Sequence, residues 1–137
     1  MIIIACVDER NGMMFNNRRQ SRDRKLISHI LKLIDGNNLW ITNYSKELFE
    51  SEETSNIIID DDFFDKIKKD EYCFIEDILP NSFVNKIEKI ILYEWQRVYP
   101  ADKYFDIDLS KWELECEEEL VGSSHEKILQ KRYIRRG

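Results

Sequence analysis

The chain has 137 residues, a hydrophobic fraction of 42% and a charged fraction of 35%. A chain of this length forms one domain, residues 1–137, and this composition is typical of a folded soluble protein rather than a disordered one. Every apolar run is far shorter than the ~20 residues of a membrane span. The first run, Met1–Val7, lacks the basic segment of a signal peptide. We therefore expect a cytoplasmic protein with no membrane partner.

Cysteine and histidine usage argues against disulfides and against metal binding. Cys6, Cys73 and Cys116 are far apart and form no CxxC pair, so we expect three reduced thiols in the core. His29 and His125 have no metal-ligand spacing to each other or to a cysteine. We therefore expect no metal site.

The net charge of −6 is unevenly distributed along the chain. Residues 18–25 are strongly basic around the single acid Asp23, whereas residues 47–77 and 113–119 are strongly acidic. Such segregation indicates a local basic face and does not by itself indicate nucleic-acid binding.

The N-terminal third predicts a buried strand followed by a helix. Ile2–Val7 is a continuous apolar run rich in β-branched residues, which is typical of a strand buried on both faces. The Asn11–Gly12 pair predicts a turn. Ser21 is the predicted N-cap of a helix whose apolar residues, between Leu26 and Ile34, recur at helical spacing. Gly36 is the predicted left-handed residue that ends this helix.

The rest of the chain continues this alternation and ends in a hairpin. Further strands are predicted at Leu39–Thr42, Asn56–Ile59, Tyr72–Ile75 and Ile91–Val98, with short helices at Tyr44–Glu50 and from Pro80 and a polar loop at Glu52–Ser55. Trp112–Val121 alternates as a strand with one wet face, and Ile128–Arg135 is expected to pair with it antiparallel through a turn at Gly122. The sequence therefore predicts an α/β fold, with a mostly parallel sheet, flanking helices and an antiparallel C-terminal hairpin.

Three segments resemble the dihydrofolate reductase family. ACVDERNGMMFN resembles the first strand and mobile loop of that family, and QSRDRKLI resembles the start of its first helix. LYEWQRVYPADKYFDIDLSKWE resembles the late strand and the segment that leads into its final hairpin. The resemblance covers nearly the whole chain and implies a dihydrofolate-reductase-like fold. It also implies that Asp23 holds the position of the helix-start carboxylate that grips the pterin ring of the substrate.

Two departures from the family pattern argue against reductase chemistry. The family has a glycine pair where backbone approaches the cofactor pyrophosphate, and here Glu76 and Asp77 occupy that place. Thr42 and Ser45 keep the hydroxyls of a second phosphate-binding segment, but no Arg or Lys lies between them. Relative to the family pattern, one strand–helix step of the cofactor half is also missing between Glu50 and Glu76. We therefore expect no cofactor, and NADPH contacts at Thr42 and Ser45 belong to the alternative of a divergent reductase.

Short proteins of this pattern also resemble a group sometimes labelled ribonuclease Z. The residues do not support that label, because two isolated histidines cannot form the HxHxDH motif that holds two zinc ions in such nucleases.

The densest polar cluster supplies the candidate ligand-binding residues, which are Arg18, Arg19, Gln20, Ser21, Arg22 and Asp23. Guanidinium groups beside Gln and Ser near a helix start favour an anion, and we expect Arg19 to be an exposed arginine that is free to bind one. The alternative for Asp23 is a purely local role, in which it pairs with the neighbouring arginines or favours the helix start.

We interpret the protein as one that binds a small anionic or heteroaromatic ligand, or a protein partner, without reductase activity. Whether it catalyses a reaction is left open. One alternative is a divergent NADPH-dependent reductase with Asp23 as the substrate carboxylate. The other, a less favoured one, is a nucleic-acid-binding or RNA-processing factor that uses the basic face at residues 18–25.

Overall fold

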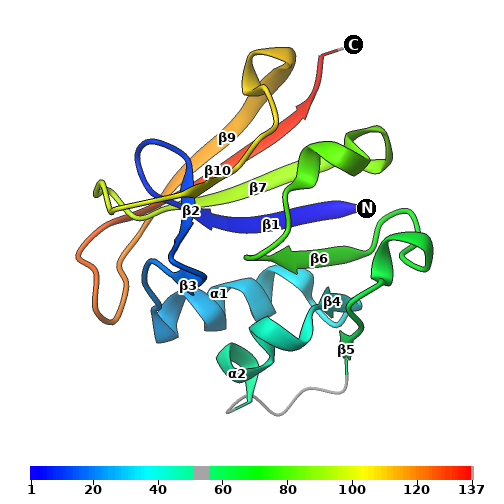
Figure 1. The fold of residues 1–137 in the computed structure, drawn as a ribbon, viewed down its shortest axis with the longest axis horizontal. Coiled ribbons are helices and arrows are strands. Elements are labelled where there is room, and N and C mark those ends of the chain that lie inside the picture. Colours follow the sequence, from blue (N-terminus) through cyan, green and yellow to red (C-terminus); the bar gives the residue numbers. More distant parts are fainter. Residues whose placement is uncertain (51–55, 137) are drawn as a thin grey trace.

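A computed structural model describes residues 1–50 and 56–136, which form a central seven-stranded sheet and a smaller three-stranded sheet (Figure 1). The predicted polar loop Glu52–Ser55 lies outside the described residues. Among the residues described, no helix is long and apolar enough to cross a membrane.

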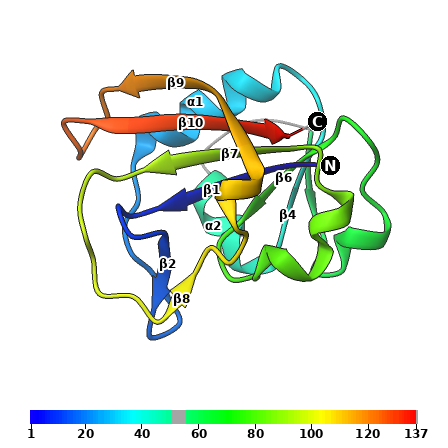
Figure 2. The ribbon, with the colours of Figure 1, turned by 90° about the horizontal axis from the view of Figure 1, so that it is seen from above.

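The central sheet is parallel over five strands and antiparallel over the last two. In spatial order its strands are β5 (Ile57–Ile59), β4 (Leu39–Ile41), β6 (Tyr72–Ile75), β1 (Ile2–Val7), β7 (Lys89–Glu94), β10 (Ile128–Arg135) and β9 (Trp112–Leu120). Figure 2 shows β9, β10, β7 and β1 following one another across the sheet, with a helix behind them. The predicted fold class, a mostly parallel α/β sheet with a C-terminal hairpin, is confirmed.

The apolar run at the N-terminus is an interior strand, as predicted. β1 pairs in parallel with β6 on one side and with β7 on the other. Its side chains alternate between the two faces: Ile3 and Ala5 belong to one buried cluster, and Ile4 belongs to the other. All three are fully buried, which explains why this strand is apolar at consecutive positions.

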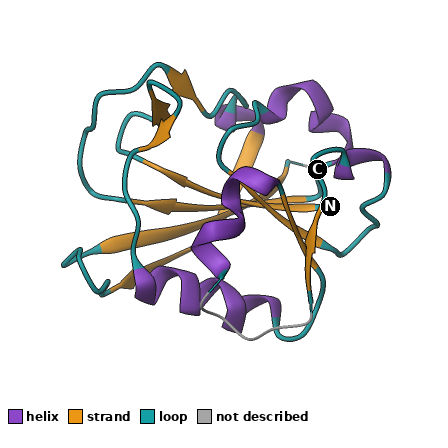
Figure 3. Ribbon diagram, turned by 60° about the horizontal axis from the view of Figure 1, so that its bottom comes forward, coloured by secondary structure: helices purple, strands orange, loops and turns teal. Residues whose placement is uncertain are grey.

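One face of the sheet is covered by α1 (Arg24–Ile34) and α2 (Lys46–Phe49), which Figure 3 shows on the same side of the strands. Leu26, Ile27, Ile30 and Ile34 form the buried stripe of α1. They pack on Ile4 and on other side chains of the same sheet face. A 3₁₀ turn, Asn43–Ser45, leads from β4 into α2.

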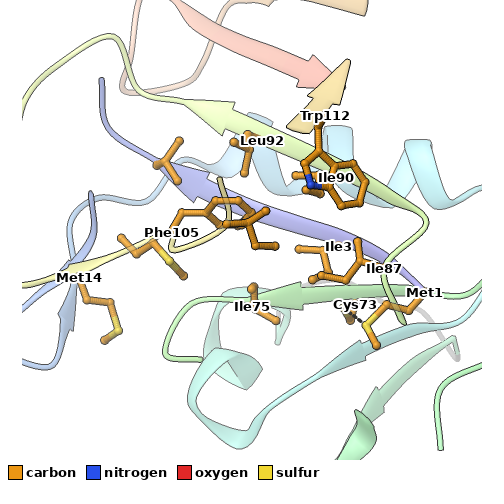
Figure 4. Close-up of a cluster of buried hydrophobic side chains, with 14 of the residues drawn as sticks. Met1, Ile3, Met14, Cys73, Ile75, Ile87, Ile90, Leu92, Phe105 and Trp112 are labelled. Carbon is orange, nitrogen blue, oxygen red and sulfur yellow. Dashed lines mark hydrogen bonds between the residues drawn. The ribbon is translucent and has the colours of Figure 1, made fainter. Parts of the chain in front are cut away.

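The opposite face is covered by loops and short 3₁₀ turns rather than by helices. The turns are Phe63–Asp65, Pro80–Lys86 and Leu109–Lys111, and the small sheet is β3 (Arg18–Arg19), β2 (Gly12–Phe15) and β8 (Lys103–Tyr104). Their apolar side chains close a second core, in which Phe105 and Trp112 lie over Ile3, Ile75 and Leu92 (Figure 4).

The helix predicted from Pro80 is instead a 3₁₀ segment, Pro80–Lys86, interrupted at Phe83 by non-helical backbone (φ −128°, ψ 27°). Seven residues rich in Asn and Ser are too few to stabilise an α-helix, and a 3₁₀ segment tolerates such a short run.

The exposed C-terminal hairpin corrects two predictions. β9 lies at the sheet edge, and between its ends, Trp112 and Leu120, its residues are exposed on both faces, so Leu114 is 48% exposed and Cys116 is exposed too. The expected strand with one wet face is therefore wet on both, and Cys116 is not a core thiol. Its glutamates suit an edge strand, because charged side chains discourage pairing with another chain.

The polar stretch before α1 contains a hairpin that was not predicted. β2 and β3 pair antiparallel across Asn16 and Asn17, whose φ angles are 53° and 60°. Two consecutive left-handed residues are typical of a type I′ turn, and asparagine tolerates that conformation. The two-asparagine pair is the sequence signal for this turn.

Replacement of Ile4 by alanine should lower the free energy of unfolding by about 3 kcal/mol, because a fully buried isoleucine leaves a cavity between β1 and α1. The matched control is Ile59→Ala in the edge strand β5, where the side chain is 41% exposed. We expect Ile59→Ala to lower the free energy of unfolding by less than about 1 kcal/mol. Urea denaturation of both variants measures the difference, and equal losses would contradict the placement of β1 in the interior.

Candidate functional site

A cleft opens where the carboxyl ends of β1, β6 and β7 meet the start of α1, and we call it the α1 cleft. It is lined by Cys6, Met13, Arg19, Gln20, Ser21, Arg22, Asp23, Leu26, Ile27, Leu48, Phe74, Glu76 and Trp95. The carboxyl ends of parallel strands are where open α/β sheets bind their ligands. The free space inside is about 20 Å³, room for about one water molecule.

An ion pair fills much of the α1 cleft. Arg19 of β3 donates from Nε and Nη2 to the two carboxylate oxygens of Glu76, at 2.8 and 3.0 Å. Its Nη1 donates to Glu47 of α2, and its guanidinium lies 4.8 Å from the ring centroid of Tyr44. Ser45 Oγ donates to Glu76 at 2.8 Å. Glu76, at the end of β6, therefore has partners for both of its oxygens.

This network corrects the expectation of an exposed Arg19. Its side chain is only 14% exposed, and that of Glu76 is 9% exposed. A bidentate guanidinium–carboxylate pair at such burial is held by charge as well as by geometry. Arg19 could receive an outside anion only by leaving Glu76 without a counter-charge inside the protein.

The residues at the end of β6 do not fit a nicotinamide dinucleotide. Thr42 and Ser45, the candidate cofactor contacts, donate their hydroxyls to Asp77 and Glu76, at 3.3 and 2.8 Å. The chain after β6 continues into the interrupted 3₁₀ segment Pro80–Lys86, which lacks the aligned N–H groups of an α-helix start that bind a pyrophosphate. Two carboxylates and no helix start make this edge a poor phosphate site.

Asp23 is the N-cap of α1, a position that the sequence analysis gave to Ser21. Its Oδ1 accepts from the backbone N–H groups of Lys25 and Leu26, at 3.0 and 3.2 Å. An aspartate that reaches two N–H groups of the first turn caps better than a serine placed two residues earlier.

The same carboxylate also binds the loop between β9 and β10, which we call the hairpin loop (residues 121–127). The backbone N–H groups of Ser123 and Ser124 donate to Asp23 Oδ1 and Oδ2, respectively, both at 2.9 Å. The hydroxyl of each serine donates to the same oxygen as its N–H group, at 3.1 and 3.2 Å. His125 Nδ1 lies 3.0 Å from Oδ2. Of the two local roles considered for Asp23, the one at the helix start is therefore present in the structure. Its remaining partners are not the neighbouring arginines but residues about 100 positions away in sequence.

The hairpin loop approaches Asp23 so closely that its second residue, Gly122, must lack a side chain. A Cβ added at Gly122 would overlap the Asp23 carboxylate. Figure 1 shows this loop beside the start of α1. Burial acts to raise the pKa of Asp23, but the hydrogen bonds from Ser123, His125 and Ser124 outweigh it and hold the pKa well below its usual range. Asp23 is therefore an ionised, fully buried carboxylate.

Gln20 joins the cleft to the loop after β1. Its Nε2 donates to Asp8 Oδ2 at 3.0 Å and to the Pro100 carbonyl at 3.4 Å. Because both partners are acceptors, the amide orientation is fixed, and Gln20 Oε1 is left buried without a partner among the described residues. Asp8, only 1% exposed, also accepts from the backbone of Gly12 at 2.8 Å and of Tyr99 at 3.1 Å.

The remaining predicted residues divide between the cleft and the surface. Arg22 lines the α1 cleft and also an open hollow beside it, whose wall includes Arg24, Glu47 and Ser123. Arg18 is exposed in β3 and lines neither. The structure therefore brings together Arg19, Gln20, Ser21, Arg22 and Asp23, and leaves Arg18 apart.

Sequence reasoning missed the residues that come from far along the chain. Glu47, Ser123, Ser124 and His125 all contact the predicted cluster. The signal available for the last three was the run Gly-Ser-Ser-His in a predicted turn, since such residues bind carboxylates through backbone and hydroxyl groups. Among the described residues, no group of three or more His, Cys, Asp or Glu side chains is arranged to hold a metal ion.

Replacement of Arg19 by alanine should lower the free energy of unfolding by about 3 kcal/mol, because it leaves Glu76 buried without its counter-charge. The double variant Arg19→Met/Glu76→Gln should recover most of that loss, since neither charge is then left alone. Arg18→Ala, next along the chain and exposed, is the control and should change stability by less than about 1 kcal/mol. Urea denaturation at pH 7 measures all three, and a double variant no more stable than Arg19→Ala would contradict the pairing.

Replacement of Asp23 by asparagine should cost about 3 kcal/mol at pH 7, because the amide turns donors toward the N–H groups of the hairpin loop. A depressed folded-state pKa stabilises the fold above the ordinary aspartate pKa of about 3.9, and that contribution is lost as the pH falls below it. The difference in the free energy of unfolding between wild type and Asp23→Asn should therefore become smaller as the pH falls below about 4.

Asp108→Asn is the matched control, because Asp108 caps an exposed 3₁₀ turn through Ser110, and this variant should lose much less stability than Asp23→Asn. Denaturant unfolding of both variants at several pH values down to 3 provides the measurement. A gap between wild type and Asp23→Asn that stays constant across this range would argue against an ionised Asp23.

The chain is similar to known proteins in structure but not in sequence. No protein-family model matches the chain, and no curated protein matches it. Among solved structures it is similar to the dihydrofolate reductase from Enterococcus faecalis complexed with NADP(H) and RAB-propyl, with a TM-score of 0.70 and 13% sequence identity, over 99% of this chain and 96% of that chain. The protein therefore has a dihydrofolate-reductase-like fold, in a divergent form that sequence comparison alone does not detect.

Proposed function

We propose that this protein binds a small anionic or heteroaromatic ligand at the rim of the α1 cleft and in the open hollow beside it, and that it has no nicotinamide-dependent reductase activity. The observation that carries the proposal is the Arg19–Glu76 ion pair at the carboxyl end of β6. It puts a paired, partly buried carboxylate where the fold would otherwise receive a cofactor phosphate.

Electrostatics supports the absence of a dinucleotide. A phosphate beside Glu76 and Asp77 would meet two negative charges, and one such pair at ~4 Å is unfavourable by about 4 kcal/mol at an effective dielectric constant of 20. Arg19 offsets Glu76 only while it stays paired with it. A loss of about 4 kcal/mol corresponds to nearly a thousandfold in affinity.

The cleft and its rim retain groups that suit a smaller ligand. Gln20 Oε1 is a buried acceptor without a partner among the described residues, and a ligand N–H or O–H group would satisfy it. Arg22 and Arg24 are exposed at the open hollow and favour a negative charge. Asp23 is not such a contact, because its carboxylate is already saturated by the hairpin loop.

Thermal-shift measurements with pterins, mononucleotides, inorganic phosphate and NADPH test this proposal. We expect at least one of the first three to raise the melting temperature and NADPH to leave it unchanged. Purified protein should also fail to oxidise NADPH with dihydrofolate above a heat-inactivated sample. A shift with NADPH together with turnover would establish the reductase alternative.

Arg22→Ala should reduce the shift by any anionic ligand that responds, whereas Arg136→Ala, an exposed arginine far along the chain, should not. No shift with any compound would count against the cleft as a small-ligand site. Binding only to RNA, with affinity that falls steeply as salt rises, would favour the nucleic-acid alternative.

A further inference from the structure

Ser21, His125 and Asp23 form a chain of hydrogen bonds at the wall of the α1 cleft. Ser21 Oγ lies 2.9 Å from His125 Nε2, and His125 Nδ1 lies 3.0 Å from Asp23 Oδ2. The three residues come from two ends of the chain, just before α1 and in the hairpin loop. Their order and distances match those between a serine nucleophile, its general base and the carboxylate that orients the base.

The chemistry of the partners fixes the tautomer of the histidine. Asp23 is ionised and can only accept, so the hydrogen of a neutral His125 ring lies on Nδ1, which donates to it. Nε2 then carries the lone pair and accepts the hydroxyl hydrogen of Ser21. This is the arrangement in which a histidine can take a proton from a serine.

Ring stacking and hydrogen bonds hold the His125 imidazole in one orientation. Its ring stacks on Trp95, with centroids 4.5 Å apart and planes inclined by 29°. Its side chain is 7% exposed, and that of Asp23 is fully buried. The backbone N–H groups of Ser123, Ser124 and Leu26 fix the carboxylate from other directions. A base with one orientation needs no reorganisation when it acts.

The serine, unlike His125, lines the α1 cleft. Ser21 is half-buried and lines the α1 cleft together with Cys6, Met13 and Trp95. The next residue, Arg22, is exposed and lines the same cleft, and its positive charge also acts on the carboxylate of Glu47. A guanidinium at the wall of the cleft suits a negative charge that develops on a reacting oxygen.

We propose that Ser21 is the nucleophile of an acyl-transfer site that hydrolyses esters of small carboxylic acids, with His125 as general base and Asp23 as positioning residue. Ser21 Oγ forms a bond to the acyl carbon while its proton passes to His125 Nε2. The bond from that carbon to the alcohol oxygen breaks, and the alcohol leaves with the proton from Nε2. Water then passes a proton to His125 Nε2 as its oxygen bonds to the acyl carbon, the bond from that carbon to Ser21 Oγ breaks, and Oγ takes the proton back from Nε2 as the acid leaves.

A fluorophosphonate probe tests the nucleophile directly, because the oxygen of an activated serine displaces fluoride from phosphorus. We expect peptide mapping by mass spectrometry to find the label on Ser21 of the wild-type protein, ahead of every other serine. Ser21→Ala should abolish that label. Ser28→Ala, the same change in a half-buried serine of α1, should not alter it. The wild-type protein should also hydrolyse p-nitrophenyl acetate, and Ser21→Ala should lose that activity.

His125→Gln keeps a similar volume and removes the base, so we expect labelling of Ser21 to slow by about 100-fold or more. Its melting temperature, measured alongside, shows whether the variant is folded. Label spread over exposed serines such as Ser110 in the wild type, or labelling of Ser21 that persists in folded His125→Gln, would overturn the proposal. This inference goes beyond the ligand-binding proposal and does not depend on it, since labelling needs no thermal shift and a thermal shift needs no reactive serine.

Discussion

The buried carboxylate of Asp23 is the constraint on which the functional end of this molecule depends. It joins the start of α1 to the hairpin loop, about 100 residues away in sequence. One oxygen caps the helix, and together the two oxygens bind consecutive backbone N–H groups of the loop. A buried carboxylate that lacks hydrogen-bond partners strongly destabilises a protein. Movement of either segment away from Asp23 would remove such partners and is therefore unfavourable. The position of Ser21 relative to His125 follows from this single group.

The second constraint is the ion pair between Arg19 and Glu76, which reshapes the cleft from its other side. Glu76 at the end of β6 needs a partner because it is largely buried, and β3 supplies one only because the turn at Asn16 and Asn17 folds Arg19 back over the cleft. Glu47 and Tyr44 then hold the guanidinium from the α2 side. The Glu76 carboxylate is thus accompanied by a paired arginine, and the two together fill much of the α1 cleft.

The fold could be predicted from the sequence to a large extent because its signals are local. The consecutive apolar residues of β1 indicated burial on both faces, and the alternation around Gly122 indicated the terminal hairpin. Predictions failed where tertiary packing or turn geometry decides, as at the two faces of β9, at the 3₁₀ segment after Pro80 and at the Asn16–Asn17 turn. At the site, the cluster from Arg19 to Asp23 was predicted, but Glu47 and the hairpin loop were not. Their contacts span about 30 to 100 residues, and one sequence carries no record of such pairs.

Structural and chemical roles for Asp23 do not exclude each other. A carboxylate that orients a catalytic histidine must stay ionised and immobile, and backbone N–H groups achieve both by stabilising the charge and fixing the oxygens. The contacts that make Asp23 a link between α1 and the hairpin loop are therefore the contacts that a positioning residue requires. What separates a reactive serine from a merely structural one is the surroundings of its own oxygen. Ser21 differs from Ser123 and Ser124 in this respect, because their hydroxyls point to the carboxylate, whereas the Ser21 hydroxyl meets the basic nitrogen of the ring beside a cleft.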